Sequence, residues 1–185
     1  MFGSGERIRY TVSAALDGGL GCMLVAATSR GVCSVLLGED AGELAAELRR
    51  RFPGADVQED PALSPRMEAV LRTLGEPAVA PELPLDLRGT AFQARVWAAL
   101  GAIPCGETRS YAQVAAAVGN PKAVRAVARA CADNPAALVV PCHRVIGSNG
   151  KLTGYRWGLE RKQALLDMEQ RSHAWERIPQ VSEMR

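Results

Sequence analysis

Three prolines close together set the strongest limit on how this chain of 185 residues can fold. Pro77, Pro81 and Pro84 lie within one short stretch, and a proline ring removes a backbone donor and clashes with the preceding helical turn. No helix is therefore expected over residues 76–85. The stretch also separates two parts of the sequence with different patterns. We place a domain boundary near 84–88 and predict three segments: a supporting N-terminal α/β domain over 6–85, a C-terminal domain over 86–170 and a polar tail over 171–185.

The N-terminal part has the apolar pattern of β-strands. Residues 8–14 alternate between apolar and polar side chains, which is the period of a half-buried strand. Apolar runs over 20–27 and 32–37 are separated by turn residues, so we expect a small antiparallel sheet. The other elements expected here are helices at about 41–51 and 65–74 and a surface connection over 53–65.

The C-terminal part is predicted to be mainly helical. Thr90 and Ser110 can each cap the start of a helix. Asn120 and Pro121 favour the start of another helix, which we expect to run from 121 to about 132. Two short helices joined by a glycine-containing turn are typical of a helix-turn-helix. A solvated helical hairpin fits the same pattern.

The apolar stretch 138–140 predicts a short buried strand that leads into Cys142, and a last helix is expected at about 159–169. The fold class is therefore α+β. A small N-terminal antiparallel-sheet domain with helices precedes a mainly helical C-terminal domain, which contains the helix-turn-helix and a candidate active-site cysteine.

Charge is distributed unevenly between the two parts. Residues 1–85 carry eight basic and twelve acidic side chains, whereas residues 86–170 carry eleven basic and six acidic ones. A nucleic-acid surface would therefore lie in the second part, although so few charges can also divide by chance. The expected second helix carries three basic residues on neighbouring faces, Lys122, Arg125 and Arg129. This arrangement is typical both of a DNA-binding helix and of an ordinary solvated helix face.

The composition argues against a membrane-spanning or secreted protein and against a metal site. No apolar run approaches the roughly 20 residues that span a bilayer, and the first residues lack the pattern of a secretion signal. We expect a cytoplasmic protein that does not contact membranes. Five cysteines without paired spacing, and only two histidines, predict neither a disulfide framework nor a metal site.

Cys142 is the residue with the clearest chemical potential. A thiolate is a strong nucleophile, and His143 follows it directly as a candidate base. Adjacent residues on an extended strand point to opposite faces, so His143 need not touch the sulfur directly, and a bridging water could relay the proton. A buried structural cysteine is the competing interpretation, and the dipeptide alone does not decide between the two.

The surrounding motifs resemble those of the O6-alkylguanine-DNA alkyltransferases, also called methylated-DNA–protein-cysteine methyltransferases. The hexapeptide from Pro141 to Ile146 is similar to the family signature. Other similar blocks occur in the same order, and the whole most resembles the alkyltransferase half of Ada-type proteins. These blocks cover residues 86–93, 103–108, 110–111, 119–127 and 154–158.

The resemblance implies direct DNA repair that turns over once. Cys142 would accept the alkyl group from guanine O6 irreversibly and without a cofactor. His143 would act as the base through a water, Glu169 would orient it, and Asn134 would join the same network. Tyr111 would help to turn the nucleotide out of the duplex and protonate the departing guanine.

The resemblance also implies a set of DNA and substrate contacts. Arg125 would fill the place of the flipped base, which must leave the stack to reach a buried thiol. The second helix would lie in the minor groove, where small residues such as Ala126 allow a close approach. Val145 and Arg156 would contribute backbone groups to the guanine edge. The remaining predicted contacts are Lys122 on the basic helix, Tyr155 as a pocket wall and Trp157 at a pocket position that is glycine in some relatives.

The implied partner is double-stranded DNA containing O6-alkylguanine, with O4-alkylthymine left open, and the protein is expected to be a monomer acting at the nucleoid. Cys22 and Cys33 do not supply the zinc–cysteine cluster of Ada-type regulators, so these residues do not support a transcriptional role, although the chain could be one part of a longer product. Alkyltransferase-like proteins, which mark lesions without transfer, have another residue where this chain has Cys142. An unrelated cysteine hydrolase would leave Arg125 unexplained.

Overall fold

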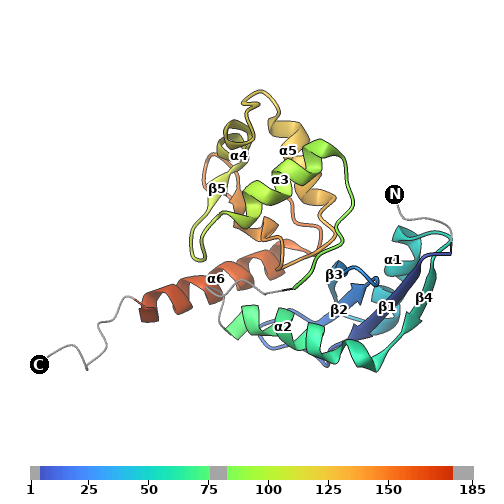
Figure 1. The fold of residues 1–185 in the computed structure, drawn as a ribbon. Coiled ribbons are helices and arrows are strands. Elements are labelled where there is room, and N and C mark those ends of the chain that lie inside the picture. The colour runs from blue at the N-terminus through green and yellow to red at the C-terminus, as the bar shows by residue number, and fades with distance from the viewer. Residues whose placement is uncertain (1–4, 76–82, 177–185) are drawn as a thin grey trace, which may run out of the picture.

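The computed structural model describes residues 5–75 and 83–176 (Figure 1). It has a sheet with flanking helices and a separate group of helices, with the long helix α6 (Leu159–Glu176) between the helical group and α2. The predicted α+β class is thus confirmed. Most of the proline-rich segment, residues 76–82, and the tail from 177 lie outside the described residues.

The sheet has the strand order β3-β2-β1-β4. Strands β1 (Arg7–Val12), β2 (Cys22–Ala27) and β3 (Val32–Gly38) are antiparallel neighbours, as expected from their apolar pattern. The expectation of only a surface connection over 53–65 was wrong, because β4 (Asp56–Glu59) pairs parallel to β1 there. This edge strand is polar and half exposed, so its pairing depends on backbone bonds that leave no apolar signal.

Helices cover both faces of the sheet. Helix α1 (Ala41–Arg51) coincides with the predicted range, and Asp40 caps it by accepting from the Glu43 amide at 2.9 Å. Leu44 and Leu48 of α1 pack on the face that presents Ile8 and Leu24. The short helix η1 (Pro61–Leu63) and helix α2 (Ser64–Gly75) follow β4, and α2 packs into the core on the other face.

The free edge of β3 is covered by two segments of the C-terminal part. The Val32 amide donates to Pro84 and its carbonyl accepts from Asp86, both at 2.8 Å. Farther along the strand, Val35 bonds in the same way with Pro135 and Ala137. One apolar cluster continues from the sheet into the C-terminal helices, so the two predicted domains share a core.

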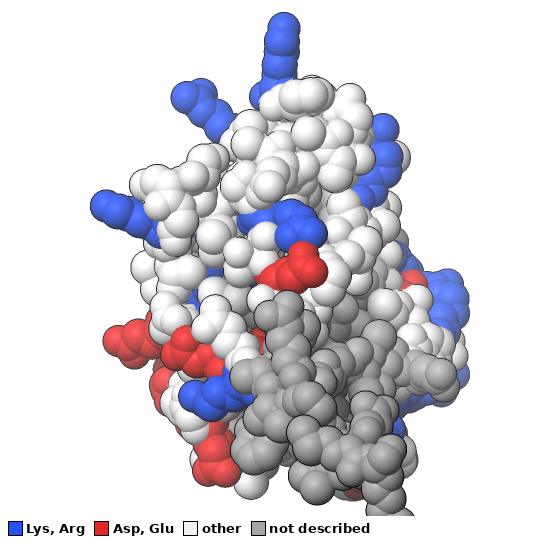
Figure 2. Space-filling view, turned by 90° about the vertical axis from the view of Figure 1, so that its left-hand side faces the viewer, with Lys and Arg blue, Asp and Glu red and all other residues white. Residues whose placement is uncertain are grey.

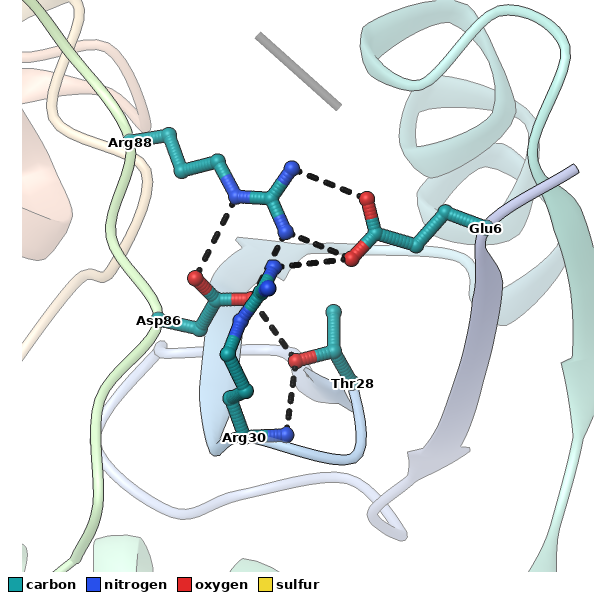
Figure 3. A network of polar contacts seen from close by, with 5 residues as sticks. All are labelled: Glu6, Thr28, Arg30, Asp86 and Arg88. Atoms are coloured by element: carbon teal, nitrogen blue, oxygen red, sulfur yellow. Dashed lines mark hydrogen bonds and ion pairs between the residues drawn. The ribbon is translucent and has the colours of Figure 1, made fainter. Parts of the chain in front are cut away.

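A polar network ties the start of the C-terminal part to the sheet (Figure 3). Asp86 accepts from the Thr28 hydroxyl at 2.7 Å and pairs with Arg30 and Arg88. Glu6, just before β1, accepts from the same two arginines. The network therefore fixes the chain where it enters the C-terminal part.

Two of the C-terminal helices begin at the predicted caps. Thr90 caps α3 (Ala91–Gly101) and Ser110 caps α4 (Tyr111–Ala117), and the amide of each cap residue donates in return to the side-chain oxygen of a glutamine three residues later. Both caps rest on contacts within one helical turn, which is why the sequence indicates them. The remaining elements are β5 (Arg109–Ser110), α5 (Val124–Ala132), η2 (Cys142–Arg144) and β6 (Val145–Ile146).

Two predicted helix limits were wrong. Helix α5 begins at Val124 rather than 121, because the Ala123 amide bonds to the Asn120 carbonyl at 2.9 Å and closes a tight turn first. Helix α6 continues to Glu176 rather than ending near 169, so the first residues of the expected tail are helical. The sequence from 159 to 178 contains no glycine or proline that would stop the helix.

Candidate active site

Cys142 lines a cavity of about 530 Å³ in the C-terminal part. Its walls come from the start of α4, one side of α5 and the loop before α6. Five of the predicted site residues meet at this cavity: Cys142, Tyr111, Arg125, Tyr155 and Arg156. The other lining residues are Val124, Ala128, Cys131, Ala132, Thr153 and Gly154.

The segment before Cys142 is a series of tight turns, so the strand predicted over 138–140 was wrong. Leu138 has a φ of 69°, a left-handed conformation that costs a leucine about 1–2 kcal/mol. The Val140 amide bonds back to Ala136 at 2.9 Å, and Cys142 then opens the short helix η2. Apolar composition indicated burial here but could not distinguish a buried turn from a strand.

Asn134 holds these turns and the thiol together. It is fully buried, and its side-chain amide donates to the Val140 carbonyl at 2.8 Å and to Cys142 Sγ at 3.1 Å. Its side-chain oxygen accepts from the Ala136 amide at 2.9 Å. One asparagine therefore both stabilises the strained turn and donates a hydrogen bond to the sulfur.

The Cys142 thiol is protonated at neutral pH in this environment. Burial raises its pKa to about 11, against the opposing effects of the Asn134 hydrogen bond and the positive charge of Lys162. A buried thiol with this pKa is a poor nucleophile until its proton is removed. The site therefore needs a base that acts together with bond formation.

His143 and Glu169 form a buried pair that can supply such a base. Their Nε2 and Oε1 atoms lie 2.7 Å apart. Burial by itself would raise the pKa of Glu169, but hydrogen bonds and charges of His143 and Arg144 lower it to about 2. The ionised carboxylate must accept, so Nε2 carries the imidazole hydrogen and Nδ1 keeps a lone pair.

The free nitrogen of His143 is unusual for a buried polar atom. Nδ1 is buried without a hydrogen-bond partner in the structure. Burial lowers the pKa of the imidazole and outweighs the opposing effect of Glu169, so the ring is neutral at pH 7. A neutral imidazole with an unused acceptor, adjacent in sequence to a protonated thiol, is suited to general-base chemistry.

Arg144 belongs to the site although the sequence analysis gave it no role. Its guanidinium donates to both oxygens of Glu169 at 2.9–3.1 Å and to the Ile103 carbonyl at 2.6 Å. The Gly106 amide adds a further bond to Glu169 at 3.1 Å. Arg144 follows His143 directly, and that adjacency was the available signal.

Lys162 is the second residue that sequence reasoning missed. It is fully buried on α6, and its ammonium donates to the carbonyls of Val145 at 2.5 Å and Thr153 at 3.1 Å. Burial lowers its pKa, whereas nearby Cys142 raises it. Its place beside Leu166 and Leu165 on the apolar side of the helix was the only signal in the sequence.

Two tyrosines form part of the cavity wall. The Tyr111 hydroxyl donates to the Thr153 carbonyl at 3.0 Å, and burial raises its pKa, so it keeps its proton. The Tyr155 hydroxyl is buried without a partner, and burial raises its pKa as well. The Tyr155 phenol is therefore available as a hydrogen-bond donor to a ligand in the cavity, whereas Tyr111 would have to release the Thr153 carbonyl to donate to one.

Four predicted contacts do not line the cavity. Val145 is buried in β6, where its carbonyl accepts from Lys162. Trp157 is buried and packs edge to face on Tyr155, with ring centres 5.1 Å apart. Lys122 and Ala126 are exposed, Lys122 just before α5 and Ala126 on the helix itself.

Basic side chains gather on the C-terminal part. In Figure 2, Lys and Arg project from the upper region, where Figure 1 places α3, α4 and α5, and the visible Asp and Glu lie lower. Arg125 on α5 lines the cavity, and Arg129 on the next turn pairs with Asp133. Of these basic side chains, Arg125 and Arg156 line the cavity itself.

The described residues bring together no group of three or more His, Cys, Asp or Glu side chains that could hold a metal ion. Within the same residues, no helix combines the length and the apolar character that crossing a bilayer requires.

Comparison with known proteins identifies relatives with the same fold. Residues 91–171 match the family model described as "6-O-methylguanine DNA methyltransferase, DNA binding domain". The chain is 49% identical over 168 residues to the Escherichia coli "Bifunctional transcriptional activator/DNA repair enzyme Ada", covering 90% of this chain and 47% of that protein. It is 45% identical over 132 residues to the inducible methylated-DNA–protein-cysteine methyltransferase of Bacillus subtilis, covering 71% and 74%.

A solved structure of Mycobacterium tuberculosis OGT in complex with DNA has a similar fold. Its TM-score is 0.69 at 37% identity, with 90% of this chain and 94% of that chain covered. The chain spans about half the length of the first curated relatives that it matches.

Proposed function

This chain belongs to the O6-methylguanine-DNA methyltransferase family, and on that premise we propose that it repairs DNA by moving an alkyl group from guanine O6 to Cys142. The names of its relatives and the DNA-bound structure of one of them support this activity. The observation that carries the assignment is the buried His143–Glu169 pair, with an unused imidazole nitrogen, directly after a cysteine that lines a cavity.

The transfer is a single displacement. Sγ of Cys142 attacks the alkyl carbon, a C–S bond forms and the bond between that carbon and O6 breaks. His143 takes the thiol proton through a water at Nδ1, and the resulting imidazolium is stabilised by Glu169. Guanine leaves with the electrons of the broken bond and is neutralised by a proton from Tyr111.

The cysteine accepts one group and is not regenerated. A thioether is a stable product with no easily broken bond. The protein would therefore act once per molecule, as an irreversible acceptor, and would need no cofactor.

The target base must leave the duplex to reach the sulfur. Cys142 is only 4% exposed, so O6 of a stacked guanine stays out of reach. Entry from the minor-groove side would place Arg125 at the vacated position and Tyr155 against the flipped base. The cavity of about 530 Å³ falls within the range of sites that enclose small ligands.

The proposed partner is double-stranded DNA that contains O6-alkylguanine, with O4-alkylthymine as an untested second lesion. We propose that the protein acts as a monomer on the nucleoid in the cytoplasm. The basic side chains on the C-terminal part, with Arg125 at the cavity, support DNA as the partner, because phosphate contacts supply most sequence-independent affinity.

Mass spectrometry of the intact protein tests this function. Mixing with a duplex that holds one O6-methylguanine should add one methyl group per molecule, located on the peptide that contains Cys142. Cys142→Ala should gain no methyl group and still bind the lesion.

Two outcomes would contradict the proposal. Methylation of the Cys142→Ala protein would place the acceptor elsewhere. Tight, lesion-selective binding by the unaltered protein without any mass gain would instead indicate a protein that marks the lesion.

A further inference from the structure

The N-terminal part reaches the Cys142 cavity through one ion pair. Arg156 lines the cavity, and its guanidinium donates to the carboxylate of Glu47 on α1 at 2.5 Å. The same guanidinium donates to the Ala132 carbonyl at the end of α5, at 3.4 Å. A single side chain therefore connects the loop before α6, helix α5 and helix α1.

Glu47 is itself held firmly. It accepts from Arg50 at 2.9 Å and from Arg51 at 3.1 Å, in addition to Arg156. Burial would raise its pKa, but the hydrogen bonds from Arg51, Arg50 and Arg156 together lower it to about 2. The carboxylate is therefore ionised at any pH at which the protein would work, and it offers Arg156 a charged acceptor.

The contact lies where it can control the width of the cavity. Ala132 and Arg156 both line the cavity, one on the α5 side and the other on the loop side. The bond from Arg156 to the Ala132 carbonyl therefore joins two walls of the cavity. If the guanidinium were released, these walls would lose the polar contact that joins them there.

We propose that Glu47 is a positioning residue which, through Arg156, sets the separation of α5 and the 153–156 loop and so limits the size of the O6-alkyl group that is accepted. This role rests on the proposed function, since it presumes transfer to Cys142. It also gives the N-terminal part a role in substrate selection, although that part contributes no residue to the lining of the cavity.

Selectivity between a small and a large alkyl group tests the role. Two duplexes of one sequence, with O6-methylguanine or O6-benzylguanine at the same position, would be mixed with excess protein. The single-turnover rates give a methyl-to-benzyl ratio. Glu47→Gln should lower this ratio by about tenfold, the scale of one hydrogen bond between charged groups.

Arg156→Met should lower the ratio equally, because it breaks the same connection from the other end. The double variant should show no further change, since both substitutions remove one interaction. Additive effects in the double variant would mean that Glu47 does not act through Arg156.

Two controls separate positioning from general loss of stability. Glu43→Gln changes an exposed carboxylate one turn earlier on α1 and should leave the ratio unchanged. Arg51→Met removes another partner of Glu47 that does not line the cavity, so it should lower thermal stability but keep the ratio.

An unchanged ratio in Glu47→Gln, or an equal change in Arg51→Met, would overturn the proposed role of Glu47. Failure of the proposed function would look different, because the unaltered protein would then transfer neither alkyl group.

Discussion

At the scale of single residues, the site combines a thiol that holds its proton with a neutral imidazole that can remove it. Burial raises the pKa of Cys142 to about 11 and lowers the pKa of His143. Between these two pKa values the thiol is protonated and the base is free. A reaction in which His143 removes the proton during transfer should therefore be independent of pH over that range.

The pH profile of transfer distinguishes this mechanism from attack by free thiolate. The unaltered protein should react at a constant rate from about pH 6.5 to 8.5. His143→Gln should be slower by about 100-fold or more at pH 7, and its rate should rise about tenfold per pH unit as thiolate forms. Single-turnover rates on a methylated duplex give both profiles, with lesion affinity measured alongside. A flat profile in the variant would show that another group is the base.

Several site residues could be predicted from sequence because motifs mark them. Cys142, His143 and Tyr111 lie in motif blocks, and the structure places Cys142 and Tyr111 at the same cavity. Lys162 could not be predicted in the same way, because its role depends on carbonyls that only the folded chain brings to it.

At the scale of elements, signals that act within one helical turn predicted well, and signals that need distant partners did not. Thr90 and Ser110 cap their helices through neighbouring amides, so sequence alone indicated where α3 and α4 begin. Strand β4 exists because β1 offers it an edge, and the turn at Leu138 exists because Asn134 bonds across it. Neither partner is visible in the local pattern.

Helix α5 is the element whose position on DNA can be tested. Arg125 lines the cavity, whereas Lys122 is exposed on the turn before the helix. Arg125→Ala should slow transfer from duplex DNA about tenfold or more, because the vacated place in the stack is then unfilled. Lys122→Ala should cost only one phosphate contact and weaken binding at higher salt.

Single-stranded DNA provides the control for this comparison, because its bases need not be flipped out of a stacked duplex. Both variants should transfer from a single-stranded substrate at nearly the rate of the unaltered protein. Equal effects of the two substitutions on duplex DNA would mean that Arg125 contributes only its charge.

At the scale of the whole molecule, the two predicted domains are joined more closely than a boundary near 84–88 suggests. They share an apolar cluster, and segments of the C-terminal part cover the edge of β3. The proline-rich stretch showed where the pattern changes, but a change of pattern does not show whether the parts pack separately. We therefore expect the two parts to unfold together.

Unfolding in urea tests this expectation through the network of Figure 3. All three tryptophans follow residue 86, so their fluorescence reports on the C-terminal part, whereas hydrogen exchange of β2 peptides reports on the sheet. The two transitions should coincide in the unaltered protein.

Asp86→Asn should lower the free energy of unfolding by about 1–3 kcal/mol, because Thr28, Arg30 and Arg88 lose a charged acceptor. The midpoints of both transitions should therefore move together to lower urea concentration. Glu59→Gln, at an exposed position on β4, should change neither. Separate transitions in the unaltered protein would instead show two independent domains, and the Asp86 variant would then shift the midpoints unequally.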